Sequence, residues 1–160
     1  MHHAREDPVR SIVHALKYDG RRILAAHMAR RWARTLPQDF FRKEVIWIPV
    51  PQHWARSWQR GFSQSLLLAK NLRRERAIAL DTKLLRRVKH TRTQTRLTPA
   101  ERRKNVRNAF RVRKTCPIPE GVILIDDVIT TGATMEECAR TLKRAGVKWV
   151  GAAAFAKAKP

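Results

Sequence analysis

The sequence predicts a single α/β domain in which helices flank a mainly parallel sheet. The chain has 160 residues, a length typical of one domain, and 43% of them are hydrophobic, which is enough for one core. The apolar run at 122–125 follows Gly121, is rich in β-branched residues and is too short for a helix, which indicates a buried parallel strand. Apolar residues then recur at helical spacing until Gly146, namely Met135, Cys138, Ala139 and Leu142. A strand, a polar turn and a helix make half of a βαβ unit.

The N-terminal part of the chain predicts helices. Apolar residues at helical spacing favour a helix over 8–16, and a turn follows at Asp19 and Gly20. A second helix is expected over 21–36, with Pro37 marking its end and one apolar face made by Leu24, Met28 and Trp32. We expect residues 1–44 to form a small helical hood and residues 45–160 to form the sheet core.

The rest of the chain predicts strands and helices in alternation. Residues 45–50 favour a strand, and Pro49 and Pro51 suit its end because neither can donate to a ladder. A loop over 52–60 then precedes a helix that opens at Gly61. Further elements are expected in this order: a short strand over 84–88, a loop over 91–97, a helix with Thr98 as N-cap and Pro99 in its first turn, an alternating segment over 109–113, and a last strand over 148–156.

The net charge of +22 is the second strong signal, because it opposes compaction and attracts polyanions. The excess is concentrated between residues 86 and 114, where twelve Lys or Arg residues accompany the single acid Glu101. Charge runs are also common on solvated surfaces, so a plain basic surface and nucleic-acid binding are weighed equally. The candidates for nucleic-acid contact form the basic face of the helix that begins at Thr98: Arg102, Arg103, Lys104 and Arg107.

Composition also restricts the compartment and the metal chemistry. No stretch approaches the roughly 18 apolar residues of a membrane span, and the N-terminus has no apolar signal core. Cys116 and Cys138 are too few for a disulfide framework or a cysteine-rich zinc site, and both suit structural roles in a reducing compartment. We therefore expect a cytoplasmic protein without a zinc site.

The nine residues 126–134 carry the clearest functional signal. Asp126 and Asp127 follow the predicted strand, and the ligand crevice of an open parallel sheet lies at the carboxyl ends of its strands. Paired carboxylates there can accept hydrogen bonds from a ribose diol and attract Mg²⁺, which prefers oxygen ligands and bridges to phosphates. The turn that follows offers hydroxyls and backbone N–H groups at a helix N-terminus, an anion site formed by Thr130, Thr131, Gly132, Ala133 and Thr134.

Two other interpretations of this segment were weighed. Thr134 and Glu137 fit a capping box, but capping explains neither the two aspartates nor the rest of the turn. Two acids after an apolar strand also occur in nucleotide triphosphatases, but the chain has no G-x-x-x-x-G-K-[ST] motif. A site for a ribose 5-phosphate compound is favoured over both.

Residues 124–134 resemble the phosphoribosyl pyrophosphate (PRPP) motif of type I phosphoribosyltransferases, and three further stretches are similar to the competence protein F (ComF) family. These stretches are 12–20, 48–64 and 91–110, so the resemblance covers nearly the whole chain. The chain departs from the family at Ser63, where asparagine is usual. The sequence also does not include the N-terminal cysteine-rich metal module that many members carry, which leaves open a naturally short form and a truncated one. The resemblance implies the type I phosphoribosyltransferase fold.

The resemblance also implies further site residues. Arg56, Arg60 and the weaker candidate Gln64 would hold the pyrophosphate, although Arg60 suits a solvent-facing helix start equally well. A flexible basic loop at about 86–97 would close over PRPP and keep a ribosyl cation from water, with Lys89, Arg92 and Gln94 over the pyrophosphate. Lys17, in the first of the similar stretches, is an additional candidate.

The function expected from this resemblance is binding of PRPP with Mg²⁺ in a protein of natural competence that handles incoming single-stranded DNA, together with a competence partner protein. Two alternatives remain, an active phosphoribosyltransferase of nucleotide metabolism and a PRPP-responsive regulator without catalysis. The sequence leaves catalysis, the acceptor base and the oligomeric state open.

Overall fold

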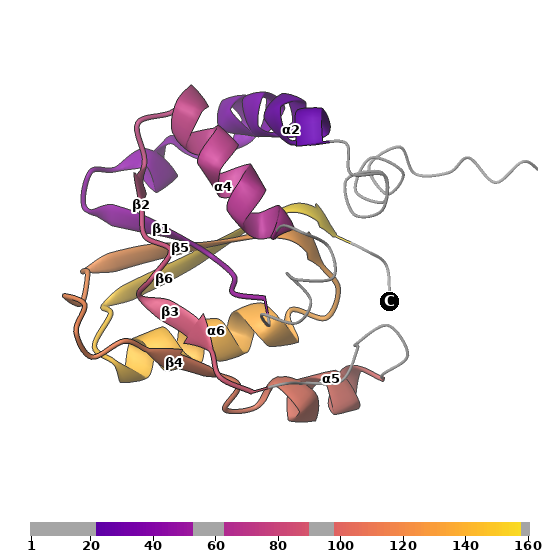
Figure 1. Ribbon diagram of the computed structural model, residues 1–160, viewed down its shortest axis with the longest axis vertical. Helices are drawn as coiled ribbons and strands as arrows, with labels where there is room; N and C mark the ends of the chain where they lie inside the picture. Colours follow the sequence, from indigo (N-terminus) through magenta and orange to yellow (C-terminus); the bar gives the residue numbers. More distant parts are fainter. Residues whose placement is uncertain (1–21, 53–62, 90–97, 158–160) are drawn as a thin grey trace, which may run out of the picture.

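A computed structural model describes residues 22–52, 63–89 and 98–157 (Figure 1). The predicted helix over 8–16 and most of the loop over 52–60 lie outside these residues. The described elements follow in the order α2 (Arg22–Thr35), the 3-10 turn η1 (Gln38–Phe41), β1 (Val45–Pro49), α4 (Gln64–Glu75), β2 (Ala79–Leu80), β3 (Leu85–Arg87), α5 (Pro99–Val106), β4 (Phe110–Val112), β5 (Gly121–Ile129), α6 (Ala133–Arg144) and β6 (Trp149–Lys157).

The main sheet has four strands in the order β2-β1-β5-β6, and all of its neighbouring strands are parallel. This confirms the predicted mainly parallel sheet. The strand β5 lies between β1 and β6, with Ile123 opposite Trp47 on one side and Gly151 on the other. A second, antiparallel sheet joins β3 to β4, which the sequence did not predict as a pair.

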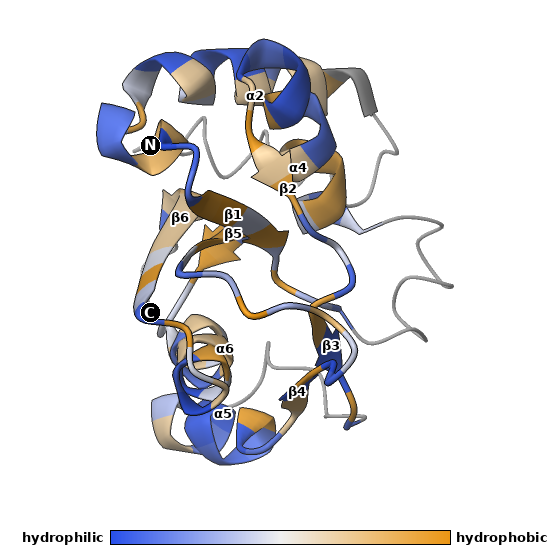
Figure 2. Cartoon of the chain, turned by 90° about the vertical axis from the view of Figure 1, so that its left-hand side faces the viewer, coloured by the Kyte–Doolittle hydropathy of each residue, from blue (hydrophilic) through white to orange (hydrophobic). Residues whose placement is uncertain are grey.

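The two faces of β5 supply two separate cores, because successive side chains of a strand point to opposite faces. Ile123 and Ile125 pack in the core beneath α2 and α4, whereas Val122 and Leu124 pack in the core with α6, β3 and β4. Figure 1 shows α2 and α4 on one side of the sheet and α6 on the other. In Figure 2 the strands between these layers are mainly hydrophobic and the outward parts of the helices are hydrophilic.

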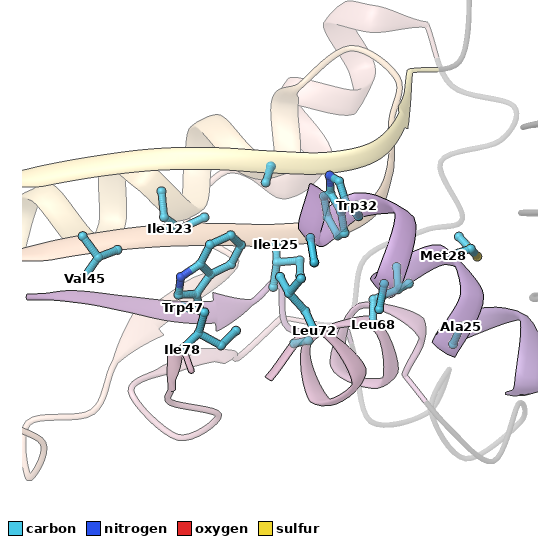
Figure 3. Packing of buried hydrophobic residues seen from close by; sticks show 14 residues of the cluster. Ala25, Met28, Trp32, Val45, Trp47, Leu68, Leu72, Ile78, Ile123 and Ile125 are labelled. Atoms are coloured by element: carbon cyan, nitrogen blue, oxygen red, sulfur yellow. The ribbon is translucent and has the colours of Figure 1, made fainter. Parts of the chain in front are cut away.

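Aromatic packing joins the N-terminal region to the first core (Figure 3). Trp47 is fully buried, stacks on Phe41 at 5.7 Å between ring centroids, and donates its indole N–H to the carbonyl oxygen of Phe40 at 3.1 Å. Trp32 of α2 lies edge-on to Phe155 of β6. Burying one large apolar side chain stabilises a fold by about 1.5–3 kcal/mol. The described helix of the region 1–44 is thus part of the core layer, and residues 1–21 of the expected hood lie outside the described residues.

Two boundaries differ from those expected, and a third agrees. The helix α4 begins at Gln64, because Ser63 is its N-cap and accepts from the backbone N–H of Leu66 at 3.4 Å. Residues 86 and 87 of the expected flexible loop belong to β3, since Arg87 pairs with Phe110 in the second sheet. The helix α5 begins as predicted, with Thr98 and Glu101 forming a capping box.

Among the residues that the structure describes, no helix combines the length and apolar character that crossing a membrane requires.

Candidate ligand-binding site at the end of β5

The two aspartates of the motif lie in a strand that extends beyond its neighbour. The ladder between β1 and β5 ends with Pro49 opposite Ile125, after which the N–H of Val50 donates to the carbonyl oxygen of Ile125 at 2.9 Å. The strand β5 continues to Ile129, and over these last residues it pairs with β6 alone among the described strands. The expectation that the polar turn starts at Asp126 was wrong, because β6 keeps β5 in register for four more residues.

Asp126 lies just past the end of β1 and contacts α4. Its Oδ1 accepts a hydrogen bond from the Ser65 hydroxyl at 2.7 Å and another from the backbone N–H of Asp127 at 2.9 Å. Burial, together with the neighbouring Asp127 carboxylate, raises the pKa of Asp126 well above its ordinary value. The thiol of Cys138 also has a raised pKa, because it is buried and Asp126 is near it.

The second carboxylate of the pair is also largely shielded from water, since Asp127 is only 6% exposed. Two adjacent acids in such a site repel one another, and a cation or hydrogen-bond donors would favour their ionised forms. The pair can therefore serve hydroxyl donors of a sugar and a hard divalent cation such as Mg²⁺. Its oxygen-only donor set fits that metal.

The turn after β5 supplies a second kind of site. Gly132 is the N-cap of α6, with φ +79° and ψ −10° in the left-handed region that favours glycine, and no side chain caps the helix there. A Cβ at Gly132 would lie 3.6 Å from Oε1 of Glu136. The N–H of Ala133 has only a long contact of 3.5 Å to the Thr131 hydroxyl. This arrangement leaves the start of α6 suited to an anion.

The capping-box alternative for Thr134 and Glu137 is wrong. Thr134 is the second residue of α6, two positions after the N-cap. Glu137 is buried, and its Oε1 accepts from the backbone N–H of Asn108 at 2.9 Å while its Oε2 pairs with Arg140 at 3.2 Å. The side chain of Glu137 thus ties α6 to the turn before β4.

The start of α4 forms the wall next to Asp126. Gln64 is fully buried and its Oε1 accepts from the Gln52 side chain at 2.9 Å. Among the described residues, Nε2 of Gln64 has no hydrogen-bond partner, so it can donate to a ligand oxygen. Sequence reasoning missed Ser65, whose only signal was its place in the first turn of a helix that faces the strand end.

The other predicted residues lie elsewhere. Lys89 donates from Nζ to the carbonyl oxygen of Arg107 at 3.3 Å, on the side of the second sheet. Arg103, Lys104 and Arg107 are exposed at α5, and Arg102 is half-buried. Lys17, Arg56, Arg60, Arg92 and Gln94 lie outside the described residues. Within the described ranges, no three His, Cys, Asp or Glu side chains cluster into a site that could hold a metal ion by side chains alone, whereas Mg²⁺ is usually bound by one or two carboxylates together with substrate phosphates.

The chain is similar in sequence to two kinds of curated bacterial proteins. The chain is 41% identical over 113 residues to competence protein F of Haemophilus influenzae and 35% identical over 152 residues to DNA utilization protein YhgH of Salmonella typhi. These alignments cover 69% and 89% of this chain but only 49% and 64% of the relatives. The expected resemblance to the ComF family is thereby confirmed.

A hypoxanthine phosphoribosyltransferase from Staphylococcus aureus superposes with a TM-score of 0.47 and 14% identity, covering 81% of this chain and 61% of that one. Residues 65–160 match the model of the phosphoribosyl transferase domain, a segment that includes the strand, the turn and the helix of the site. This match and the parallel sheet confirm the predicted fold class. The chain belongs to the phosphoribosyl transferase domain family.

Proposed function

We propose that the chain binds PRPP together with Mg²⁺ at the end of β5. The observation that carries this proposal is the placement of a half-buried carboxylate, a buried carboxylate and a glycine-capped helix start within one strand-turn-helix unit. Asp126 and Asp127 suit the ribose hydroxyls, and Thr130, Thr131, Gly132, Ala133 and Thr134 suit the 5-phosphate. Gln64 suits a pyrophosphate oxygen, because its amide Nε2 has no partner among the described residues.

Charge balance supports a role for the metal. The raised pKa of Asp126 reflects a carboxylate that is ionised at a cost when no cation is near. A bound Mg²⁺ would neutralise part of the pyrophosphate charge and supply a bridge between it and the protein. The Ser65 hydroxyl keeps Asp126 oriented for this task through its 2.7 Å hydrogen bond.

The biological setting that we propose is the use of incoming DNA, with a competence partner protein, in the cytoplasm. The relatives are named competence protein F and DNA utilization protein, and the net charge of +22 suits a polyanionic partner. Cys116 and Cys138 are both free thiols, in keeping with a reducing compartment. A phosphoribosyltransferase activity and a purely regulatory PRPP site are the alternatives.

Calorimetric titration with PRPP, with and without Mg²⁺, tests the proposal. The double variant Asp126→Asn/Asp127→Asn should lose Mg²⁺-dependent affinity, because its amides no longer attract the cation. The matched control is Asp39→Asn/Glu120→Gln, which removes two carboxylates that are 77% and 65% exposed and should bind as the unmodified chain does. Unchanged affinity in the Asp126/Asp127 variant would sink the assignment.

Catalysis is tested separately. Pyrophosphate release is followed after PRPP is mixed with each common nucleobase in turn. The competence role predicts that PRPP binds without sustained pyrophosphate release. Turnover with any base that disappears in the Asp126/Asp127 variant would instead place the active transferase first.

A further inference from the structure

A second concave site lies away from the motif, between the second sheet and the C-terminal half of α6. Its volume is about 880 Å³, and six cationic side chains line it: Arg86, Lys89, Arg111, Arg113, Lys114 and Arg144. We call this hollow the basic groove. In Figure 1 its elements β3, β4 and α6 lie on the opposite side of the main sheet from α2 and α4.

The basic groove has no acid available to balance its cations. Glu137 is the one carboxylate in its lining, and both of its oxygens are engaged, by Asn108 and by Arg140. Within the described parts of the chain, none of the six cations forms an ion pair with an acid. Their charge is therefore directed at solvent or at a ligand.

Two of these cations oppose each other directly. Arg86 of β3 and Arg111 of β4 are register partners in the antiparallel sheet, and both are exposed. Like charges at such positions destabilise a strand pair. An anion bound between them would remove that repulsion, so the arrangement has its lowest energy when a negatively charged ligand is present.

The lining favours the backbone of a nucleic acid over its bases. Phe110 is only 3% exposed and packs in the core with α6, β3 and β4, so it offers no stacking surface. The guanidinium of Arg87 lies 5.3 Å from the centre of its ring. The cations are spread over two strands, the turn after β4 and the end of α6, which suits successive phosphates along a strand. Proteins that bind single strands without sequence preference use a positively charged groove that follows the backbone, whereas many proteins that read a duplex insert a helix or strand into its major groove.

We propose that the basic groove binds the phosphate backbone of single-stranded nucleic acid. The proposal rests on the DNA-handling part of the proposed function and is independent of PRPP. The turn at Gly132 starts α6, and Thr141 and Arg144 lie about 14 to 18 Å further along its axis, at a rise of about 1.5 Å per residue. The helix α6 would thus contribute its first residues to the PRPP site and its last residues to the basic groove.

The test measures fluorescence anisotropy of a labelled 20-residue oligothymidylate over a salt series. The groove variant is Arg111→Gln/Arg113→Gln/Lys114→Gln, whose three positions are exposed. It should bind at least tenfold more weakly at low salt, and the log–log salt slope should flatten by about 2, because each neutralised phosphate of a single strand contributes about 0.7. PRPP affinity should stay unchanged.

Two charge-matched triples are compared with it. Arg31→Gln/Arg34→Gln/Arg73→Gln removes exposed cations of α2 and α4, across the main sheet, and should change the affinity less than twofold. Arg103→Gln/Lys104→Gln/Arg107→Gln tests α5, the segment favoured by the sequence, and should have a smaller effect than the groove variant. A duplex of the same length should bind more weakly than the single strand.

The outcomes separate the two proposals. An unmodified chain that binds no oligonucleotide overturns both the DNA role and the groove. Normal binding by the groove variant, or a larger loss in either matched triple, overturns the groove alone. Loss of PRPP binding in the groove variant would mean that the basic groove is part of the PRPP site, and it overturns the proposal of a separate site. Tighter binding of the duplex than of the single strand overturns the assignment to single-stranded nucleic acid.

Discussion

Replacing Asp126 with asparagine should stabilise the ligand-free protein at neutral pH. The amide keeps an Oδ1 that accepts from the Ser65 hydroxyl and from the backbone N–H of Asp127, so both hydrogen bonds of the carboxylate persist. The variant removes a charge that burial and the Asp127 carboxylate both disfavour. Asp126, which we propose as a ligand-binding residue, is thus expected to lower the stability of the protein when no ligand is bound.

The magnitude follows from the linkage between protonation and folding. Because the folded-state pKa of Asp126 is raised, the folded chain binds more protons than the unfolded chain between the ordinary and the raised pKa, and stability falls as pH rises through this window. A tenfold change in a protonation equilibrium corresponds to about 1.4 kcal/mol. A gain of at least about 1 kcal/mol is expected at pH 7.5, or roughly 2–4 °C in Tm for a chain of this size.

Thermal unfolding without Mg²⁺ or PRPP, at pH 4 and pH 7.5, measures this effect. The gain of Asp126→Asn should be small at pH 4, where the raised pKa keeps the carboxyl of the folded protein protonated, and larger at pH 7.5. Asp39→Asn, at a largely exposed position, is the control and should show no such growth. An Asp126→Asn protein that unfolds earlier than the unmodified chain at pH 7.5 would refute the reasoning.

Three further predictions concern single positions. Gly132→Ala should lower the free energy of unfolding by about 1–2 kcal/mol in urea titrations, because φ at this position is +79°, and a β-branched residue there should also remove protection by ribose 5-phosphate; an unchanged midpoint would contradict the need for glycine. Glu136→Gln should strengthen the binding of inorganic phosphate at the start of α6, because the carboxylate of Glu136 repels the anion; calorimetry measures this affinity. The same variant should lower the stability of the ligand-free protein by about 0.3–1 kcal/mol, because an acid in the first turn interacts favourably with the helix dipole; thermal unfolding measures this loss. Arg111→Gln should raise stability by about 0.2–1 kcal/mol at low salt, and the gain should shrink in 1 M salt, because it relieves repulsion from Arg86; a gain independent of salt would argue against that cause.

The elements that the sequence predicted well are those specified by local patterns. The apolar run after Gly121 identified β5, and the Thr98-Pro99 start identified α5, because a buried strand and a capped helix leave signals within a few residues. The end of β5 was missed because pairing with β6 extends it into polar residues. The pairing of β3 with β4 was missed because these short strands are separated by more than twenty residues.

The candidate site likewise has a part that local sequence patterns predict and a part that they do not. The positions of Asp126, Asp127 and Gly132 near a strand end and a helix start could be predicted, because these residues lie close in sequence to the apolar run of β5 and to the first turn of α6. Ser65, the Gln52–Gln64 contact and the bond from Asn108 to Glu137 join segments that are far apart along the chain or across a loop. Such contacts depend on how the layers pack, and no local pattern indicates them. Glu137 in particular had only a capping box as its local explanation, whereas its buried carboxylate links α6 to the turn before β4.

The unequal lengths of β1 and β5 leave part of β5 without a partner on one side, among the residues that the structure describes. Pro49 occupies the last rung of β1, and Pro51 has no N–H with which to continue the ladder, so the sheet is one strand narrower beside Asp126 than beside Ile125. The open edge of β5 beside Asp126 therefore depends on the neighbouring strand and not on the residues of the motif. Extending β1 by two residues that can pair would cover this edge while every carboxylate and glycine of the motif stayed in place.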